Sequence, residues 1–200
     1  MLFKDPLHWF PDPYFSTVLV LFIFGVFFIE YIVVPRAIAR VGSDHPILVR
    51  DRSSITVIGF IGIVAIIAAL VFRYLNITVA PDVVQYIGLG LIPIGLAVRE
   101  WAIIKLGHFF TRTVQIKPDH QLITNGPYRW IRHPAYTGML LIDLGIALAL
   151  GTWIGGMLTL VLVLGATMYR VFIEEKVLIE TFGDVYLDYI KHSWKLFPGL

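Results

Sequence analysis

Residues 135–172 constrain the fold more than any other part of the chain. This stretch is apolar almost throughout, and it is too long for one membrane crossing, which takes about 20 apolar residues. Small residues interrupt it at Gly151-Thr152-Trp153 and at Gly155-Gly156. These observations predict a tight helical hairpin, which returns the chain to the side of the membrane from which it came.

Three further apolar windows precede the hairpin, at residues 15–34, 55–72 and 83–104. A signal peptide is the alternative for the first window, but its apolar core should be shorter and end at a small-residue cleavage site. Glu30-Tyr31 and Pro35-Arg36 stand there instead, so we expect a retained span. The pattern predicts an all-α integral membrane protein with about five transmembrane helices, the last two forming the hairpin.

The composition agrees with burial in lipid. Of the 200 residues, 58% are hydrophobic and 15% are charged, whereas about a quarter are charged in a soluble domain. The chain contains no repeat or linker that would divide it. We therefore predict one membrane domain over residues 1–200, with three spans in 1–104, a polar cytoplasmic segment at 105–134, the hairpin at 135–172 and a cytoplasmic tail at 173–200.

The basic residues predict the orientation, because Lys and Arg near span ends favour the cytoplasmic side. Between the predicted spans, the side that faces residues 105–134 and the tail carries nearly all of them. The opposite side carries only Lys4 and Arg73. We expect an outside N-terminus and a cytoplasmic C-terminus, in a prokaryotic plasma membrane or the endoplasmic reticulum. The net charge of +2 is scattered, which does not suggest nucleic-acid binding.

The chain has no cysteine. This excludes disulfides, thiolate zinc sites, iron–sulfur clusters and cysteine nucleophiles. His108 and Arg112 lie four residues apart, but no third ligand stands near them in the sequence, so we predict no metal site.

A predicted hairpin brings the residues just before 135 and just after 172 to the same face. Pro134 suits the first turn of a helix, and Arg170 and Glu174 lie four residues apart on one helix. The structural alternative is an interfacial belt of aromatic and basic residues with a solvated helix end.

The residues in these two places form a pattern that resembles the isoprenylcysteine carboxyl methyltransferase family. The resemblance covers roughly residues 126–198, and the first 105 residues carry no signature. Phospholipid methyltransferases share the broader pattern, and membrane sterol reductases share a similar Arg-His-Pro-x-Tyr element. The matching residues are Arg132-His133-Pro134-Ala135-Tyr136-Thr137-Gly138, Arg170, Glu174-Glu175, Leu178, Phe182-Gly183-Asp184-Val185-Tyr186 and Tyr189.

The resemblance implies transfer of a methyl group from S-adenosylmethionine to the carboxylate of an isoprenylated cysteine. A carboxylate is already ionised at neutral pH and needs no general base. It needs a cation that holds it in line, and arginine can do so with two parallel hydrogen bonds. We expect Arg170 to bind the substrate carboxylate with help from Arg132. The structural alternative is that Arg170 merely pairs with Glu174.

The resemblance also places the cofactor between residues 105–134 and the hairpin. No glycine-rich loop of the Rossmann type is present. Two structural alternatives stay open: His133 as a helix-start residue bonded to backbone, and His120 as an ordinary loop residue. The expected cofactor-binding residues are His120, Leu122, Gly126, Tyr128, His133, Tyr136, Gly138 and Glu175.

A few charged residues fall within or near the spans. Asp143 lies well inside the predicted hydrocarbon, where we expect an interhelical contact, with a place in a substrate tunnel as the alternative. Glu30, Arg99 and Glu100 lie near predicted span ends. We interpret them as interfacial charges that extend toward water.

The sequence thus predicts a membrane carboxyl O-methyltransferase whose prenylated substrate arrives from the membrane lipid. Alternatives are a phospholipid or other amine N-methyltransferase, an NADPH-dependent sterol-type reductase, and a non-enzymatic membrane scaffold or transporter. Paired arginines favour a carboxylate over an amine acceptor. Lipid-facing and subunit-facing surfaces are alike in a membrane sequence, so no oligomeric state is predicted.

Overall fold

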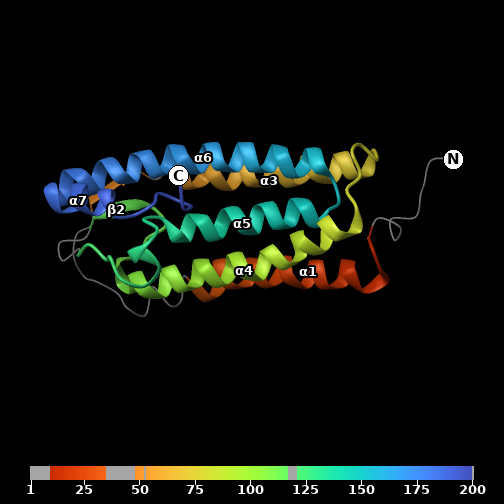
Figure 1. Cartoon of the computed structure of the whole chain (residues 1–200), viewed down its shortest axis with the longest axis horizontal. Coiled ribbons are helices and arrows are strands. Elements are labelled where there is room, and N and C mark those ends of the chain that lie inside the picture. The colour runs from red at the N-terminus through yellow and green to blue at the C-terminus, as the bar shows by residue number, and fades with distance from the viewer. Residues whose placement is uncertain (1–9, 35–47, 52, 117–120, 200) are drawn as a thin grey trace.

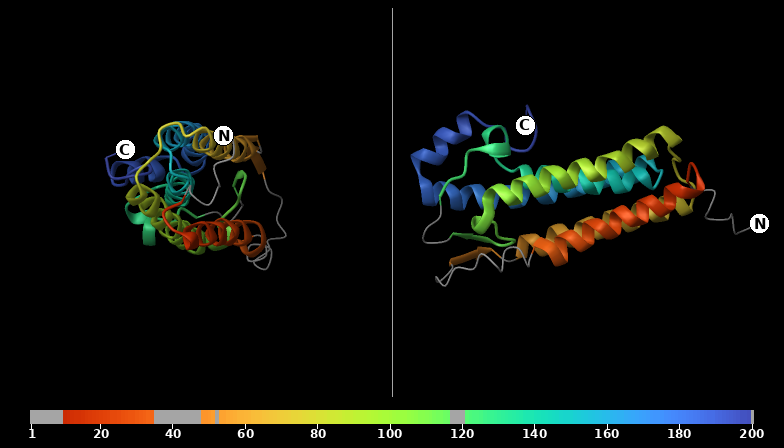
Figure 2. Two further views of the ribbon diagram at one scale, coloured as in Figure 1. Left: turned by 90° about the vertical axis from the view of Figure 1, so that its right-hand side faces the viewer. Right: turned by 90° about the horizontal axis from the view of Figure 1, so that it is seen from below.

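The computed structural model describes residues 10–34, 48–51, 53–116 and 121–199. Its long helices run alongside one another and alternate in direction, as Figure 1 and the views in Figure 2 show. This confirms the predicted all-α fold. The long helices are α1 (Pro13–Phe28), α3 (Ser53–Tyr74), α4 (Asp82–Leu106), α5 (Pro134–Ala149) and α6 (Trp153–Phe182), and a short helix α7 (Asp184–Lys191) follows.

Three of these helices, α3, α4 and α6, are long and apolar enough to cross a membrane. The other two are shorter. The α1 helix continues without a break into a wider π-helical turn at Ile29–Val33. The α5 helix has 16 residues, about 24 Å at 1.5 Å per residue, and it lies within the bundle with ten of its residues buried. It is therefore covered mainly by its neighbouring helices.

The predicted hairpin is formed by α5 and α6. The chain turns at Gly151, whose φ of +78° suits glycine, and the Thr152 side chain accepts a hydrogen bond from the Gly155 N–H to cap α6. The second arm continues to Phe182, ten residues past the predicted end at 172. Apolar windows mark where lipid ends, whereas Glu, Lys and Leu continue a helix readily in water.

Close contact between α4 and α5 depends on four glycines, spaced seven residues apart on each helix. A Cβ on Gly95 would lie 2.6 Å from the Gly138 carbonyl oxygen, and one on Gly88 would lie 2.7 Å from the Gly145 carbonyl oxygen. Side chains at these positions would force the backbones apart. Small residues thus let the two helices pack backbone to backbone, as is common in membranes.

The described residues between α4 and α5, together with α7, lie at one end of the bundle (Figure 1). Two short strands, β1 (Leu48–Asp51) and β2 (Val114–Ile116), pair there antiparallel; this small ribbon is an exception to the helical prediction. Two short 3-10 turns lie in the same part of the chain, at Gly107–Phe109 directly after α4 and at Gly126–Arg129 before α5. Part of the predicted polar segment thus has regular structure.

The charged residues near the span ends do not extend into water as we expected. Arg99 donates from Nη2 to the Glu30 carboxylate at 3.0 Å and from Nε to its other oxygen. Their side chains are only 10% and 14% exposed. Pairing the two charges offsets the cost of burying them, so this interpretation was wrong for Glu30 and Arg99.

Asp143 on α5 lies toward α3. Its carboxylate is 3.9 Å from the position that a Cβ on Gly62 would take, so the missing side chain of that glycine leaves room for it. Asp143 is not among the residues that line the pocket described below.

Candidate active site

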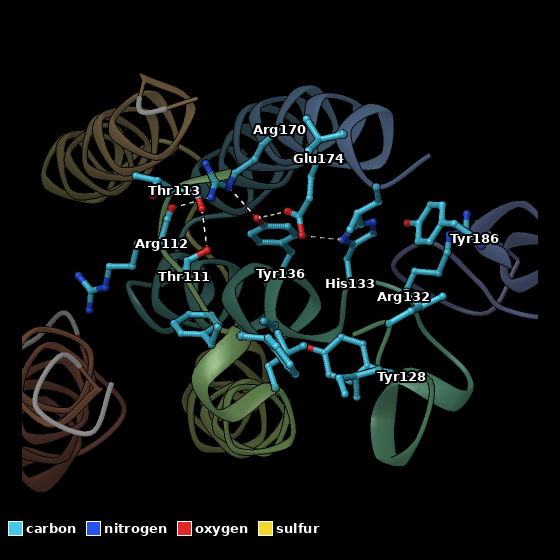
Figure 3. A pocket seen from close by; sticks show the side chains of 18 of the residues that line it. Thr111, Arg112, Thr113, Tyr128, Arg132, His133, Tyr136, Arg170, Glu174 and Tyr186 are labelled. Atoms are coloured by element: carbon cyan, nitrogen blue, oxygen red, sulfur yellow. Dashed lines mark hydrogen bonds and ion pairs between the residues drawn. The ribbon is translucent and has the colours of Figure 1, made fainter. Parts of the chain in front are cut away.

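A pocket opens where α4, α5 and α6 reach the polar end of the bundle (Figure 3). It contains about 1070 Å³ free of protein atoms, including its mouth. Aromatic, apolar and charged side chains share its wall. The lining residues are Arg99, Leu106, Phe109, Phe110, Thr111, Arg112, Thr113, Gln121, Leu122, Ile123, Tyr128, Arg132, His133, Ala135, Tyr136, Met139, Arg170, Glu174, Val177, Leu178, Tyr186 and Tyr189.

The first turn of α5 supplies one side of the pocket. The helix begins at Pro134, as predicted, because proline has no N–H to leave unpaired in a first turn. The C-terminal tail holds the two residues that precede this helix. The Arg132 and His133 N–H groups donate to the carbonyl oxygens of Trp194 and Lys195, at 2.8 and 3.1 Å. Backbone hydrogen bonds thus orient the residues that enter the helix.

The two arms of the hairpin meet at the pocket, as predicted. Arg170 donates from Nε to the Tyr136 hydroxyl oxygen at 2.6 Å, and that hydroxyl donates to Glu174 Oε2 at 2.6 Å. Figure 3 shows the three side chains in a row. The tyrosine hydroxyl therefore stands between the arginine and the carboxylate that the sequence could have paired directly.

Arg170 is only 2% exposed, and its partners are neutral. Besides Tyr136, it donates from Nη1 to Ser54 Oγ and from Nη2 to the Arg112 carbonyl oxygen, both at 2.5 Å. No carboxylate of the described residues forms an ion pair with it. The pocket wall thus contains a buried cation whose charge is not neutralised by a direct partner.

The adjacent glutamates point in different directions, because successive helical residues are about 100° apart. Glu174 lies on the pocket wall. Glu175 is not among the lining residues and accepts contacts from Arg132 Nε at 2.9 Å, His133 Nε2 at 3.3 Å and Lys195 Nζ at 3.3 Å. The sequence favoured Glu175 as the cofactor anion, but the structure places Glu174 at the pocket.

Arg132 lies on the wall, but other groups hold its guanidinium. Besides Glu175, it donates from Nη1 to the carbonyl oxygens of Ile190, at 3.2 Å, and Ser193. These contacts join the start of α5 to the C-terminal tail.

The remaining predicted cofactor residues divide into two groups. Leu122, Tyr128, His133 and Tyr136 line the pocket, whereas Gly126 and Gly138 do not. His120 lies outside the described residues.

The two glycines outside the pocket wall have structural reasons for their places. A Cβ on Gly138 would lie 2.5 Å from the Gly95 carbonyl oxygen, so this glycine lets α5 approach α4 closely. Gly126 has a φ of +60°, and a Cβ there would lie about 3 Å from the Lys105 side chain.

Sequence reasoning missed the part of the wall that follows α4. Phe109, Phe110 and residues 111–113 line the pocket but belong to no recognisable motif. The one sequence feature that could have indicated these residues is their position directly after the end of an apolar span. Tyr186 and Tyr189 were matched to the family pattern without a predicted role, and both lie on the wall.

The tyrosines outside the spans stay neutral at ordinary pH. Burial raises the pKa of Tyr128 and of Tyr186 well above the usual value of 10, and it raises the pKa of Tyr189 to about 12 against the opposing effect of Arg132. Arg99, Arg112 and Arg170 bring positive charge to the same wall. The pocket thus combines neutral hydroxyl groups with an excess of arginine, which suits an anionic ligand.

Comparison with known proteins gives consistent matches. Residues 88–180 match the model of the isoprenylcysteine carboxyl methyltransferase family. The protein-S-isoprenylcysteine O-methyltransferase of Schizosaccharomyces pombe is 33% identical over 112 residues, covering 55% of this chain and 48% of the relative. The Saccharomyces cerevisiae protein of the same name is 27% identical over 168 residues, covering 81% and 70%.

A solved structure resembles about three quarters of the chain. It is that of the eukaryotic intramembrane Ras methyltransferase ICMT, with a TM-score of 0.56 and 28% sequence identity over 76% of this chain and 55% of that chain. The chain spans about half the length of the curated relatives it matches, for example 48% of the S. pombe protein. The region matched by the family model contains nearly all of both arms of the hairpin, and over this region the chain is similar to the isoprenylcysteine carboxyl methyltransferase family.

Proposed function

We propose that this protein is an S-adenosylmethionine-dependent methyltransferase that methylates the C-terminal carboxylate of an isoprenylated cysteine. The observation that carries the proposal is Arg170, a buried arginine on the pocket wall that has only neutral hydrogen-bond partners among the described residues. The names of the relatives support the same reaction.

Arg170 has the properties needed to hold the acceptor carboxylate. An arginine keeps its charge when buried, and charge-assisted hydrogen bonds to a carboxylate are about twice as strong as neutral ones. Its three partners fix the plane of the guanidinium. The substrate carboxylate would supply the countercharge that the folded chain does not provide directly.

The donor set of the pocket fits the methyl donor. S-adenosylmethionine supplies an electrophilic methyl group on a sulfonium when bound. Tyr128, His133 and Tyr136 offer ring surfaces and hydrogen bonds to its nucleoside, Leu122 offers an apolar contact, and Glu174 offers an anion for its ammonium group.

The chain need not remove a proton for this reaction, since the acceptor carboxylate is ionised at neutral pH. Its contribution is to hold the carboxylate in line and to exclude water that would solvate it. The apolar and aromatic wall formed by Phe109, Phe110 and Met139 serves the second purpose.

We place the pocket on the cytoplasmic side, because basic residues concentrate at that end of the predicted spans. The prenyl chain would reach the pocket laterally from the bilayer, since each CH₂ buried in lipid contributes about 0.8 kcal/mol. Residues 105–134 would cover the cofactor as part of a single membrane domain.

Transfer of labelled methyl from S-adenosylmethionine to a small S-prenylcysteine tests the proposal. Wild-type protein should label the free acid and leave the matched C-terminal amide unlabelled. Arg129→Lys changes an exposed arginine near the pocket and serves as a control with unchanged labelling. Labelling of an aminophospholipid in place of the acid would show the amine methyltransferase, and no labelling of the acid would reject the proposal.

A further inference from the structure

Three of the arginines on the pocket wall are Arg99, Arg112 and Arg170, and one carboxylate of the first helix contacts two of them. Glu30 accepts from Arg99 through both of its oxygens, and its Oε2 lies 3.7 Å from Arg112 Nη2. Arg170 forms no ion pair with a described carboxylate. Glu30 thus forms ion pairs with two of the three arginines and leaves Arg170 without one.

Glu30 lies in an irregular turn at the end of the first long helix. It falls in the π-helical turn Ile29–Val33, in which the helix widens, and such turns occur often at functional sites. The side chain is only 14% exposed, so water does little to screen its charge. It is not among the lining residues of the pocket. Its effect on a ligand therefore passes through the two arginines that it contacts.

Both arginines lead on to the proposed reaction centre. Arg99 also donates from Nη1 to the Ala135 carbonyl oxygen at 3.1 Å, next to Tyr136. The Arg112 carbonyl oxygen accepts from Arg170 Nη2 at 2.5 Å. Fixing the two arginines therefore also fixes groups that orient Arg170.

We propose that Glu30 is a positioning residue that masks Arg99 and Arg112, so that the substrate carboxylate is held by Arg170 alone. The inference rests on the proposed carboxyl methylation. A carboxylate facing three equally available arginines could settle on any of them, and only one position is in line with the methyl donor. Engaging two of the three arginines with a carboxylate of the protein selects the productive position, which is a form of discrimination against wrong binding.

Glu30→Gln tests this, because it keeps the size of the side chain and removes its charge. Two unmasked arginines should then compete for the acid. We expect kcat for the prenylcysteine acid to fall about tenfold to a hundredfold, as misplacement by about 1 Å does elsewhere. The KM for the acid should not rise, and calorimetric affinity for S-adenosylhomocysteine should stay within about twofold.

Asp12→Asn is the matched control, since Asp12 joins the same two helices at the far end. Its Oδ2 accepts from the Tyr86 hydroxyl at 2.6 Å. Loss of that contact should leave kcat at the wild-type value. If Glu30→Gln also kept its kcat, or if both variants lost kcat equally, Glu30 would be only a structural link between α1 and α4 and the inference would be overturned.

A binding experiment separates this inference from the proposed function. In the wild-type background, Arg170→Lys should weaken binding of the prenylcysteine acid by about tenfold. In the Glu30→Gln background the same change should have little effect, because the acid then binds the unmasked arginines. If Arg170→Lys weakens binding of the acid equally in both backgrounds, the inference is overturned while the proposed function stands. A wild-type protein that binds acid and amide equally well overturns the proposed function and the inference together.

Discussion

The Tyr136 hydroxyl lies between Arg170 and Glu174 and bonds to both, at 2.6 Å each. It accepts from the guanidinium and donates to the carboxylate, so each charged group has a partner without meeting the other. This relay keeps the Glu174 carboxylate on the pocket wall and leaves Arg170 without a direct countercharge. The hairpin makes the arrangement possible, because Tyr136 and Glu174 come from opposite arms.

Tyr136→Phe should remove this separation. Without the hydroxyl, Arg170 and Glu174 can form a direct ion pair. Arg170 is then less available to the substrate carboxylate, and Glu174 is less available to the ammonium group of S-adenosylmethionine. We expect kcat for the prenylcysteine acid to fall by about tenfold or more, measured by methyl transfer. Tyr169→Phe, which changes an exposed tyrosine on α6, is the control. A Tyr136→Phe protein as active as the control would show that the relay is dispensable.

Arg170→Lys should lower turnover far more than cofactor affinity. A lysine cannot reproduce the three directional bonds of the guanidinium or grip a carboxylate with two parallel bonds. Loss of this transition-state contact should cost about 10²–10³ in kcat, while calorimetric affinity for S-adenosylhomocysteine changes by no more than about threefold. Near-normal turnover in this variant, alongside an unchanged Arg129→Lys control, would remove the assignment.

Glu174→Gln and Glu175→Gln should separate the roles of the adjacent glutamates. Glu175 is the shared acceptor of Arg132, His133 and Lys195, so Glu175→Gln should destabilise the protein by about 3 kcal/mol. Glu174→Gln should instead weaken binding of S-adenosylhomocysteine with little change in stability. Thermal unfolding in detergent and calorimetry measure the two effects.

Lys176→Gln is the control for both glutamates, because it changes an exposed residue on the same helix. It should leave stability and affinity at their wild-type values. A larger loss of affinity in Glu175→Gln than in Glu174→Gln would restore the cofactor role that the sequence first suggested for Glu175.

Gly138→Ala should disturb the contact between α4 and α5. Its Cβ would lie 2.5 Å from the Gly95 carbonyl oxygen and 2.7 Å from the Arg99 N, so the backbones must separate. We expect a loss of about 1–3 kcal/mol in stability. Gly90→Ala is matched to it, because a Cβ there meets nothing within 4 Å, and it should stabilise α4 by about 0.5–1 kcal/mol. Equal unfolding temperatures for the two variants would contradict this account.

Local signals made the hairpin predictable. Proline at position 134 marks a helix start, and an apolar stretch too long for one span must turn back. These two facts predict that Tyr136 and Arg170 lie at the same end of the bundle. The end of the second arm was not predictable from hydropathy, because the helix continues beyond the apolar residues.

The phase of that continued helix decides which glutamate faces the pocket, so sequence reasoning favoured Glu175 where Glu174 lies on the wall. Other features depend on tertiary contact alone. The pairing of Glu30 with Arg99 joins residues 69 positions apart, and no spacing rule connects them. The tail that crosses the start of α5 likewise has no local signature, since backbone groups make its contacts.

Asp12 should make stability depend on pH at the far end of the bundle. The Tyr86 hydroxyl and the Tyr14 and Phe15 N–H groups donate to it, and these bonds hold the pKa of Asp12 below its ordinary value of 3.8. A lowered folded-state pKa means that the contribution is fully present above about pH 4 and is lost as the pH falls through the folded-state value. Asn can still cap a helix, so comparison with Asp12→Asn isolates the charge.

The unfolding temperature of wild type should therefore exceed that of Asp12→Asn by a constant amount between about pH 5 and pH 7 and converge with it below about pH 4. Tyr86→Phe removes the strongest of the three donors and should reduce the same pH-dependent difference. Scanning calorimetry of the three proteins in detergent across this range measures it. A gap between wild type and Asp12→Asn that persists unchanged at pH 3 would mean that the carboxylate charge does not contribute, because protonation would then leave the stability difference intact.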